Sequence, residues 1–359
     1  MQIDMHYYGT YALARCAGLT REAAHTIAHS AQFVDDNVAS EVDDHDDGAK
    51  IFSVPTAHHA GDLKNREPED QRYIWVPFHF LPANEGTSWT EKLICRKDSA
   101  IAQEMVTHHI NQYERSYALE LMGITAHVYA DTFAHYGFSG VSSRRNRVKG
   151  DSFMLNQSEA VVEAALGKTF GEWIGKYGGL LTNIRSHISS MAETYSGSLG
   201  HGAVASYPDL PFLEWSFIYE QSEERVFHNN PLTYLEGAEK LHAMFRRFAL
   251  YSEEHQDEAA FRKWDELRDR VRWIFAQKGD KEERSEIWKA LMVEGNFGPA
   301  EEIPEYDDDL WNDQAHSLVD MEDSSDALDL EVHRFYRAAD YHQHYVLREL
   351  LPRHRLLVV

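Results

Sequence analysis

Three side chains that could bind a metal, those of His127, Asp131 and His135, follow one another at intervals of four residues in the stretch GITAHVYADTFAHYGFSG. In an α-helix a step of four residues turns about 40° past a full rotation, so the three side chains would share one face. Imidazole nitrogens and carboxylate oxygens are both common ligands of zinc and similar divalent cations. The spacing therefore predicts a helix that presents a metal-binding face.

The other positions of this predicted helix are apolar or aromatic, which indicates that the helix is buried. They are Ile124, Val128, Tyr129, Phe133 and Tyr136. An ionised aspartate among such residues needs a partner, because burying an unpaired charge is costly, and a metal ion would provide one. The alternative is a structural pair in which His127 and Asp131 bond to each other while His135 only ends the helix. The sequence leaves both interpretations open.

Five further residues could join this helix as metal ligands. His6 lies near the start of the chain, and His79 lies in the apolar stretch YIWVPFHFLP. Asp35 falls on the core-facing side of a predicted helix, where it would be a ligand, a base or a cap, or would simply mark the frayed end of that helix. His201 and Asp209 belong to an irregular segment, rich in Gly and Pro, whose aromatic residues would anchor it to the core.

Two other groups of basic residues could be exposed to solvent rather than part of a metal or phosphate site. His25 and His29 are spaced as ligands, but they lie on the polar side of the helix that carries Asp35, so we expect them to be solvated. Arg144 and Arg145 belong to the basic loop GVSSRRNRVKG, which follows the ligand helix. This loop could hold a phosphate beside the metals, or it could be a solvated loop that neutralises nearby acid.

The composition limits the classes of function. The 359-residue chain has a formal net charge of −24, which argues against a general surface for nucleic acid or an anionic membrane. Its two cysteines form no CxxC pair, so neither a disulfide framework nor a thiolate zinc site is expected. The start, MQIDMHYYG, lacks the features of a signal peptide, and no run of about 18 apolar residues predicts a membrane span. We therefore expect a cytoplasmic location.

No strand-like alternation persists in the sequence, and much of it has helical periodicity. We therefore predict an all-α fold, a helical bundle built around the buried metal-ligand helix with an acidic helical appendage. Residues 1–230 would form the metal-binding core, residues 231–328 charged helices and an acidic loop packed on it, and residues 329–359 a C-terminal helix that returns to the core. The run over residues 98–136 predicts either one long helix or two that meet near Gly123.

The ligand helix is similar to that of the zinc-dependent phospholipase C and single-strand nuclease superfamily. In those proteins a central helix carries a His, three residues, an Asp and then a further His, and His127 and Asp131 match this spacing. His135 comes two residues sooner than its counterpart in the phospholipases. Members of the superfamily also bind zinc through a mature N-terminal residue that cleavage produces, whereas the opening MQIDMHYYG leads us to expect no cleaved leader here.

The order of the candidates along the chain resembles the order in the same superfamily. It runs His6, Asp35, His79 or His58, the pair His127 and Asp131, and then His201 with Asp209. The resemblance implies an all-α protein with a cluster of three zinc ions. The runs DMHYYGTYALAR, PFHFLP and GHGAV also look like a bacterial protein family that supplies no activity.

These observations predict a metal-dependent hydrolase of small-molecule or lipid phosphate esters. Two or three zinc ions would lower the pKa of a bound water, Asp35 would orient or deprotonate it, and Arg144 and Arg145 would hold the phosphate. Other divalent metals fit the same ligands. One alternative is a non-catalytic protein that a metal stabilises and that binds partners through its acidic helices; another is a protein whose histidines are core residues without a metal. The sequence does not indicate an oligomeric state.

Overall fold

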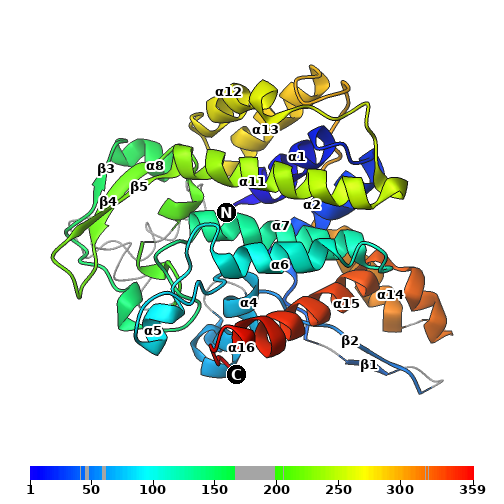
Figure 1. The fold of residues 1–359 in the computed structure, drawn as a ribbon, viewed down its shortest axis with the longest axis horizontal. Coiled ribbons are helices and arrows are strands. Elements are labelled where there is room, and N and C mark those ends of the chain that lie inside the picture. Colours follow the sequence, from blue (N-terminus) through cyan, green and yellow to red (C-terminus); the bar gives the residue numbers. More distant parts are fainter. Residues whose placement is uncertain are drawn as a thin grey trace.

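The computed structural model describes residues 1–40, 42–44, 48–58, 62–165, 199–204, 206–319, 321 and 323–359. The fold is mainly helical, as the sequence predicts (Figure 1). The α-helices are α1 (Thr10–Cys16), α2 (Arg21–Asp36), α3 (Pro68–Asp70), α4 (Val76–Phe78), α5 (Trp89–Lys92), α6 (Ala100–Ile110), α7 (Ala118–Ala134), α8 (Glu159–Ala165), α11 (Asn230–Tyr251), α12 (Trp264–Phe275), α13 (Lys281–Val293), α14 (Asp308–Val319), α15 (Glu331–His344) and α16 (Leu351–Arg353). The π-helical segments Asp4–Gly9, Gln71–Trp75 and Tyr345–Leu350 lead into α1, α4 and α16.

The described residues also contain two small antiparallel sheets, which the all-α prediction omits. Their strands are β1 (Val42–Asp44) and β2 (Lys50–Phe52) in one sheet, and β3 (Met154–Leu155), β4 (Glu214–Ile218) and β5 (Arg225–Asn229) in the other, with β4 in the middle. These strands are too short to give a persistent alternation. In addition, β4 buries the consecutive residues Trp215, Ser216 and Phe217 instead of alternating buried with exposed positions.

Helix α7 lies at the centre of the molecule, in contact with α2, α6, α11 and α15 (Figure 1). The predicted break near Gly123 is wrong, because residues 111–117 separate α6 from α7 and Gly123 lies inside α7. A Cβ atom at Gly123 would lie 2.4 Å from the carbonyl oxygen of Ile27 and 2.5 Å from Cβ of Ser30. Only glycine therefore allows α2 to approach α7 so closely, and this approach brings the end of α2 to the face of α7 that carries His127 and Asp131.

The charged helices after residue 230 share a hydrophobic core with α7. Helix α11 packs on α7 and α1, and α13 contacts the N-terminal segment Asp4–Gly9 (Figure 1). One buried cluster joins side chains from all three predicted parts of the chain, among them Met5, Phe133, Trp288 and Tyr345. Within the described ranges, no helix combines the length and the apolar character that crossing a bilayer would require.

The expectation that His29 is solvated is wrong. Its side chain is buried, and its Nε2–H donates to the carbonyl oxygen of Asp307 at 3.1 Å. The ring centroid of His29 also lies 4.3 Å from that of Trp311 in α14. The polar side of α2 therefore faces a distant part of the chain rather than solvent, which the periodicity of one helix does not reveal.

We expect the protein to lose stability as the pH falls below the ordinary histidine pKa of 6.5, because buried histidines resist protonation in the native state. Burial lowers the pKa of His29 and His342 to about 4 and that of His228 to about 3. The unfolded chain binds protons near the ordinary value, so each ring removes about 1.4 kcal/mol of stability per pH unit between its two pKa values. Urea unfolding of metal-free protein between about pH 7 and pH 5 measures this slope.

A pair of variants isolates the contribution of one ring. The buried His342 donates from Nε2 to the carbonyl oxygen of Pro77 at 2.9 Å, whereas His316 is exposed. His342→Gln should make the dependence of the free energy of unfolding on pH shallower, and His316→Gln should leave it unchanged. A free energy of unfolding that stays constant over this pH range would contradict the prediction.

Candidate metal centre

All eight predicted ligands lie together around the C-terminal half of α7. Helix α7 and the residue that ends it supply His127, Asp131 and His135; the segment Asp4–Gly9 supplies His6, α2 supplies Asp35, the residue after α4 is His79, and the turns near residues 200–209 supply His201 and Asp209. These residues fall into three groups of three, and within each group the possible ligand atoms lie within 4.8 Å of one another. Each group therefore has the residue types and the spacing to hold a metal ion.

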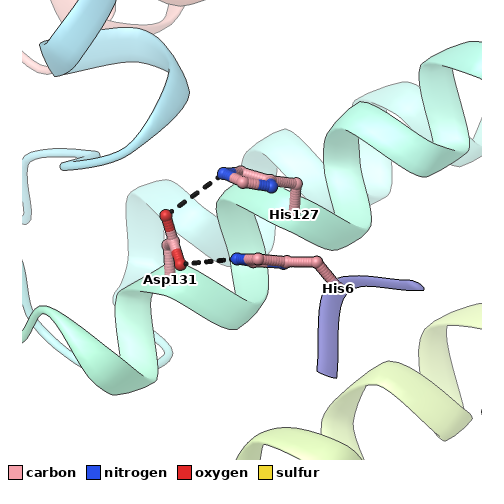
Figure 2. A group of neighbouring side chains, drawn as sticks. All are labelled: His6, His127 and Asp131. Atoms are coloured by element: carbon pink, nitrogen blue, oxygen red, sulfur yellow. Dashed lines mark ion pairs between the residues drawn. The ribbon is translucent and has the colours of Figure 1, made fainter. Parts of the chain in front are cut away.

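The first group consists of His6, His127 and Asp131, which Figure 2 shows converging from the N-terminal segment and α7. Nε2 of His6 lies 3.3 Å from Oδ1 of Asp131, and Nε2 of His127 lies 3.2 Å from Oδ2. The two imidazole rings stack with their centroids 3.9 Å apart, so both direct their Nε2 atoms at the same carboxylate. All three side chains are buried.

The second group, Asp35, His79 and His127, brings two ring nitrogens face to face. Nδ1–H of His127 donates to the carbonyl oxygen of Ala31 at 2.7 Å, and Nε2–H of His79 donates to that of Thr56 at 2.8 Å. In neutral rings these bonds leave lone pairs on Nε2 of His127 and Nδ1 of His79, which lie 3.2 Å apart. Oδ1 of Asp35 lies 3.8 Å and 3.7 Å from these two atoms. Facing lone pairs beside a carboxylate require a proton or a metal cation between them.

The third group repeats this arrangement with His135, His201 and Asp209. Nδ1–H of His135 donates to the carbonyl oxygen of His79 at 3.0 Å, so Nε2 faces Oδ1 of Asp209 at 3.5 Å. Nε2 of His201 lies 3.9 Å from Oδ2 of the same carboxylate. His135 thus ends the helix and also belongs to one of the candidate groups. From the sequence alone these two positions are alternatives.

Asp131 connects the groups and also contacts the α-amino group of Met1. Its Oδ2 lies 3.5 Å from Nδ1 of His79 and 3.4 Å from Nδ1 of His135. The amino nitrogen lies 2.8 Å from Oδ1 of Asp131 and 3.4 Å from Oδ1 of Asp209. Burial lowers the pKa of this amine, but the carboxylates, Asp131 above all, outweigh burial and raise the pKa to about 11. An ammonium group therefore offsets part of the carboxylate charge, through a contact that no pattern in the sequence indicates.

The electrostatics of the site favour further positive charge. Burial and the neighbouring His127 lower the pKa of His6 to about 3, so this ring is neutral. Burial also acts against protonation of His127, but the carboxylates of Asp131 and Asp35 outweigh it and raise the pKa of that ring. The pKa of Asp131 lies well below its ordinary value, because His135, the amine and His127 outweigh the effect of burial. Ionised carboxylates and imidazole nitrogens in this arrangement could together hold a cation.

Several buried atoms of these groups have no hydrogen-bond partner among the described residues. They are both ring nitrogens of His6, Oδ2 of Asp131, Nε2 of His135 and Oδ1 of Asp209. Leaving such a group unsatisfied costs about 1–3 kcal/mol. A divalent cation would satisfy nitrogen and carboxylate lone pairs together, so the residues present fit a metal ion.

The basic loop after α7 has other partners. Arg145 pairs with Glu91, Nη2 to Oε1 at 2.9 Å, and its Nε donates to the hydroxyl of Thr90 at 3.0 Å. Arg144 is exposed. Over the described residues, neither arginine has a hydrogen bond or ion pair with the three groups, so the phosphate-binding role stays a prediction. His58 pairs with Asp70 at 3.2 Å, and this leaves His79 as the middle histidine of the site.

A surface cavity of about 440 Å³ opens beside Asp35. It is lined by Met1, Gln2, Ile3, Gln32, Asp35, Asp36, Lys281, Tyr306 and Asp308. The Asp35 side chain is 33% exposed, whereas that of Asp131 is 1% exposed, so Asp35 stands at the border between the buried groups and the cavity. No local pattern in the sequence marks this cavity, because its walls come from distant segments.

The fold and the site define a mainly helical protein with buried histidine and aspartate groups that could hold metal ions. The chain belongs to the family of unknown function DUF6765, which it matches over residues 1–350. No curated protein and no solved structure matches the chain. None of these findings links it to the phospholipase C and nuclease superfamily, so that resemblance depends on the pattern of residues alone.

Proposed function

We propose that the protein is a metal-dependent hydrolase of phosphate esters that binds two or three divalent cations, with zinc as the metal that best suits these ligands. One observation carries the proposal, namely the facing nitrogens of His79 and His127, 3.2 Å apart and each donating its other N–H to a backbone carbonyl. Such second bonds orient metal-bound histidines in proteins. The donors in the three groups of described residues are imidazole nitrogens and carboxylate oxygens, both of which zinc accepts.

Each side chain in the site has a role that follows from its position. Bound metal ions would polarise a phosphoryl group and lower the pKa of a bound water to about 7. The buried residues, Asp131 in particular, would hold the cations and balance their charge. Asp35, with its partly exposed carboxylate at the cavity, would accept a proton from the attacking water. The cavity would admit the substrate to the open side of the site.

A second candidate function is a non-catalytic, metal-stabilised protein that acts as an interaction module. The observation that favours it is the deep burial of the first group, in which His6, His127 and Asp131 are each at most 1% exposed. Closed sites of this kind are typical of structural metals. The cavity at Asp35 favours the catalytic candidate instead, because catalytic sites keep a coordination position open to substrate.

We expect the purified protein to contain two or three equivalents of zinc and to hydrolyse a phosphodiester or phosphomonoester only with the metal bound. Elemental analysis measures the metal content, and turnover of a panel of chromogenic esters with chelator and after zinc addition measures the dependence. His79→Gln should lose metal and activity, while His58→Gln, whose ring pairs with Asp70 outside the groups, should retain both.

The outcomes separate the candidates. Ester turnover by metal-free protein in the presence of chelator would contradict a metal centre. A purified protein that takes up no added zinc would contradict it as well. Bound metal whose removal lowers the melting temperature, without metal-dependent turnover of any ester, would identify the stabilising role and reject the hydrolase.

A further inference from the structure

The cavity beside Asp35 is predominantly acidic. Asp35, Asp36 and Asp308 line it, and Lys281 is its one cationic side chain among the described lining residues. Two neighbours hold the carboxylate of Asp36, since the hydroxyl of Tyr306 and Nε2 of Gln32 donate to its Oδ2 at 2.7 Å and 3.0 Å. Lys281 therefore provides the positive charge with which this wall could attract an anion.

The position of Lys281 is unfavourable for the helix that begins with it. Lys281 is the first residue of α13, and Asp280 caps that helix by accepting from the backbone N–H of Glu283. The N-terminal end of a helix carries a partial positive charge and favours acidic residues, so a lysine there does not stabilise α13. The preference of helix N-termini for acidic residues argues against a lysine at this position. A role in the cavity therefore explains the placement of Lys281 better than a contribution to helix stability does.

Among the described residues, the ammonium group of Lys281 has one weak ion-pair partner. Its Nζ lies 3.9 Å from Oε1 of Glu282, and the two side chains are 53% and 70% exposed. By contrast, Lys289 in the same helix pairs with Glu286 at 2.7 Å and also with Glu305. A long, exposed pair contributes little, so Lys281 can leave Glu282 for an anionic ligand at small cost.

The start of α13 is nevertheless held firmly beside the site. Arg284, one turn after Lys281, is 1% exposed and bonds to Asp4 at 2.7 Å and to Oε1 of Gln2 at 2.6 Å. Gln2 lines the cavity, and Met1 lines it while contacting Asp131. A fixed helix start with a long, flexible side chain is suited to hold a small ligand against the metal groups.

We infer that Lys281 binds the anionic group of the substrate and selects a small phosphate ester with few negative charges. This inference builds on the proposed function. A cavity of about 440 Å³ fits one small molecule, since sites for such ligands span about 300–1,000 Å³. The three carboxylates repel additional negative charge, so polyphosphates and nucleic acids are poor ligands.

Calorimetry with inorganic phosphate and the zinc-loaded full chain tests this inference. Lys281→Met should weaken phosphate binding by about 3- to 10-fold and make the affinity less sensitive to salt, and Lys281→Arg should restore most of it. Lys278→Met is the matched control, because Lys278 is exposed on the same stretch and lies outside the cavity lining. The control should bind phosphate like the wild type.

Metal analysis of every sample distinguishes failure of the Lys281 inference from failure of the proposed function. Normal phosphate affinity in zinc-containing Lys281→Met protein would overturn the role of Lys281 and leave the metal centre intact. Tighter binding of tripolyphosphate than of phosphate would overturn the charge selection. If the wild type takes up no zinc, the proposed function fails, and this inference fails with it.

Discussion

Replacing Asp131 with asparagine should remove metal from the first and second groups and reduce ester hydrolysis by more than about 100-fold. Mutation of residues that only support metal ligands already costs about 10- to 100-fold, and Asp131 contacts several ligands directly. Its Oδ1 lies 3.3 Å from His6, and its Oδ2 lies 3.2 Å from His127 and 3.5 Å from His79. Asparagine keeps the shape but removes the charge that would balance the cations.

Glu120→Gln is the matched control for this variant. Glu120 belongs to the same helix and is 2% exposed, but its carboxylate pairs with Arg334 at 2.9 Å and takes no part in the three groups. Both variants replace a buried carboxylate by its amide, so a general loss of helix packing would affect both. Elemental analysis and turnover should show full metal content and activity only in Glu120→Gln. Full metal content in folded Asp131→Asn protein would contradict the assignment of Asp131 as the shared ligand.

Several of the candidate ligands stand out in the sequence because each is a polar residue in an apolar local setting. His127 and Asp131 stand out on an apolar helix, Asp35 stands on the core-facing side of α2, and His79 lies between two phenylalanines. A buried titratable group must have a compensating partner, so a local pattern alone marks it as unusual. The structure brings all of these residues together.

The grouping of these residues was not predictable, because it depends on how distant segments pack. The sequence has no signal that the α-amino group of Met1 contacts Asp131, or that Lys281 and Tyr306 line the cavity at Asp35. Gly123 illustrates the same limit. Its presence predicts a break in the helix, yet it serves the close contact with Ile27 in α2. A glycine needed for close approach and a glycine that ends a helix look alike in one sequence.

Replacing Arg284 with methionine should destabilise the protein by about 3–5 kcal/mol, as removal of one partner from a buried ion pair typically does. Arg284 is 1% exposed; its Nε donates to Oδ2 of Asp4 at 2.7 Å and its Nη2 to Oε1 of Gln2 at 2.6 Å. Without the guanidinium, the buried carboxylate of Asp4 would lack the positively charged side chain that pairs with it. Urea unfolding measures the effect, and Arg353→Met, which removes a half-exposed arginine paired with Glu349, should unfold much like the wild type.

The same substitution should also affect metal binding in one part of the site. Arg284 fixes Gln2 and Asp4, and these residues position Met1 and His6 beside Asp131. His135, His201 and Asp209 come from other elements, so the third group should keep its metal while the first loses affinity. Adding Asp4→Asn to Arg284→Met should recover part of the lost stability, because it removes the unpaired charge, without restoring metal at His6. Equal loss of metal from the first and the third group in folded protein would show that Arg284 does not act through the N-terminal segment.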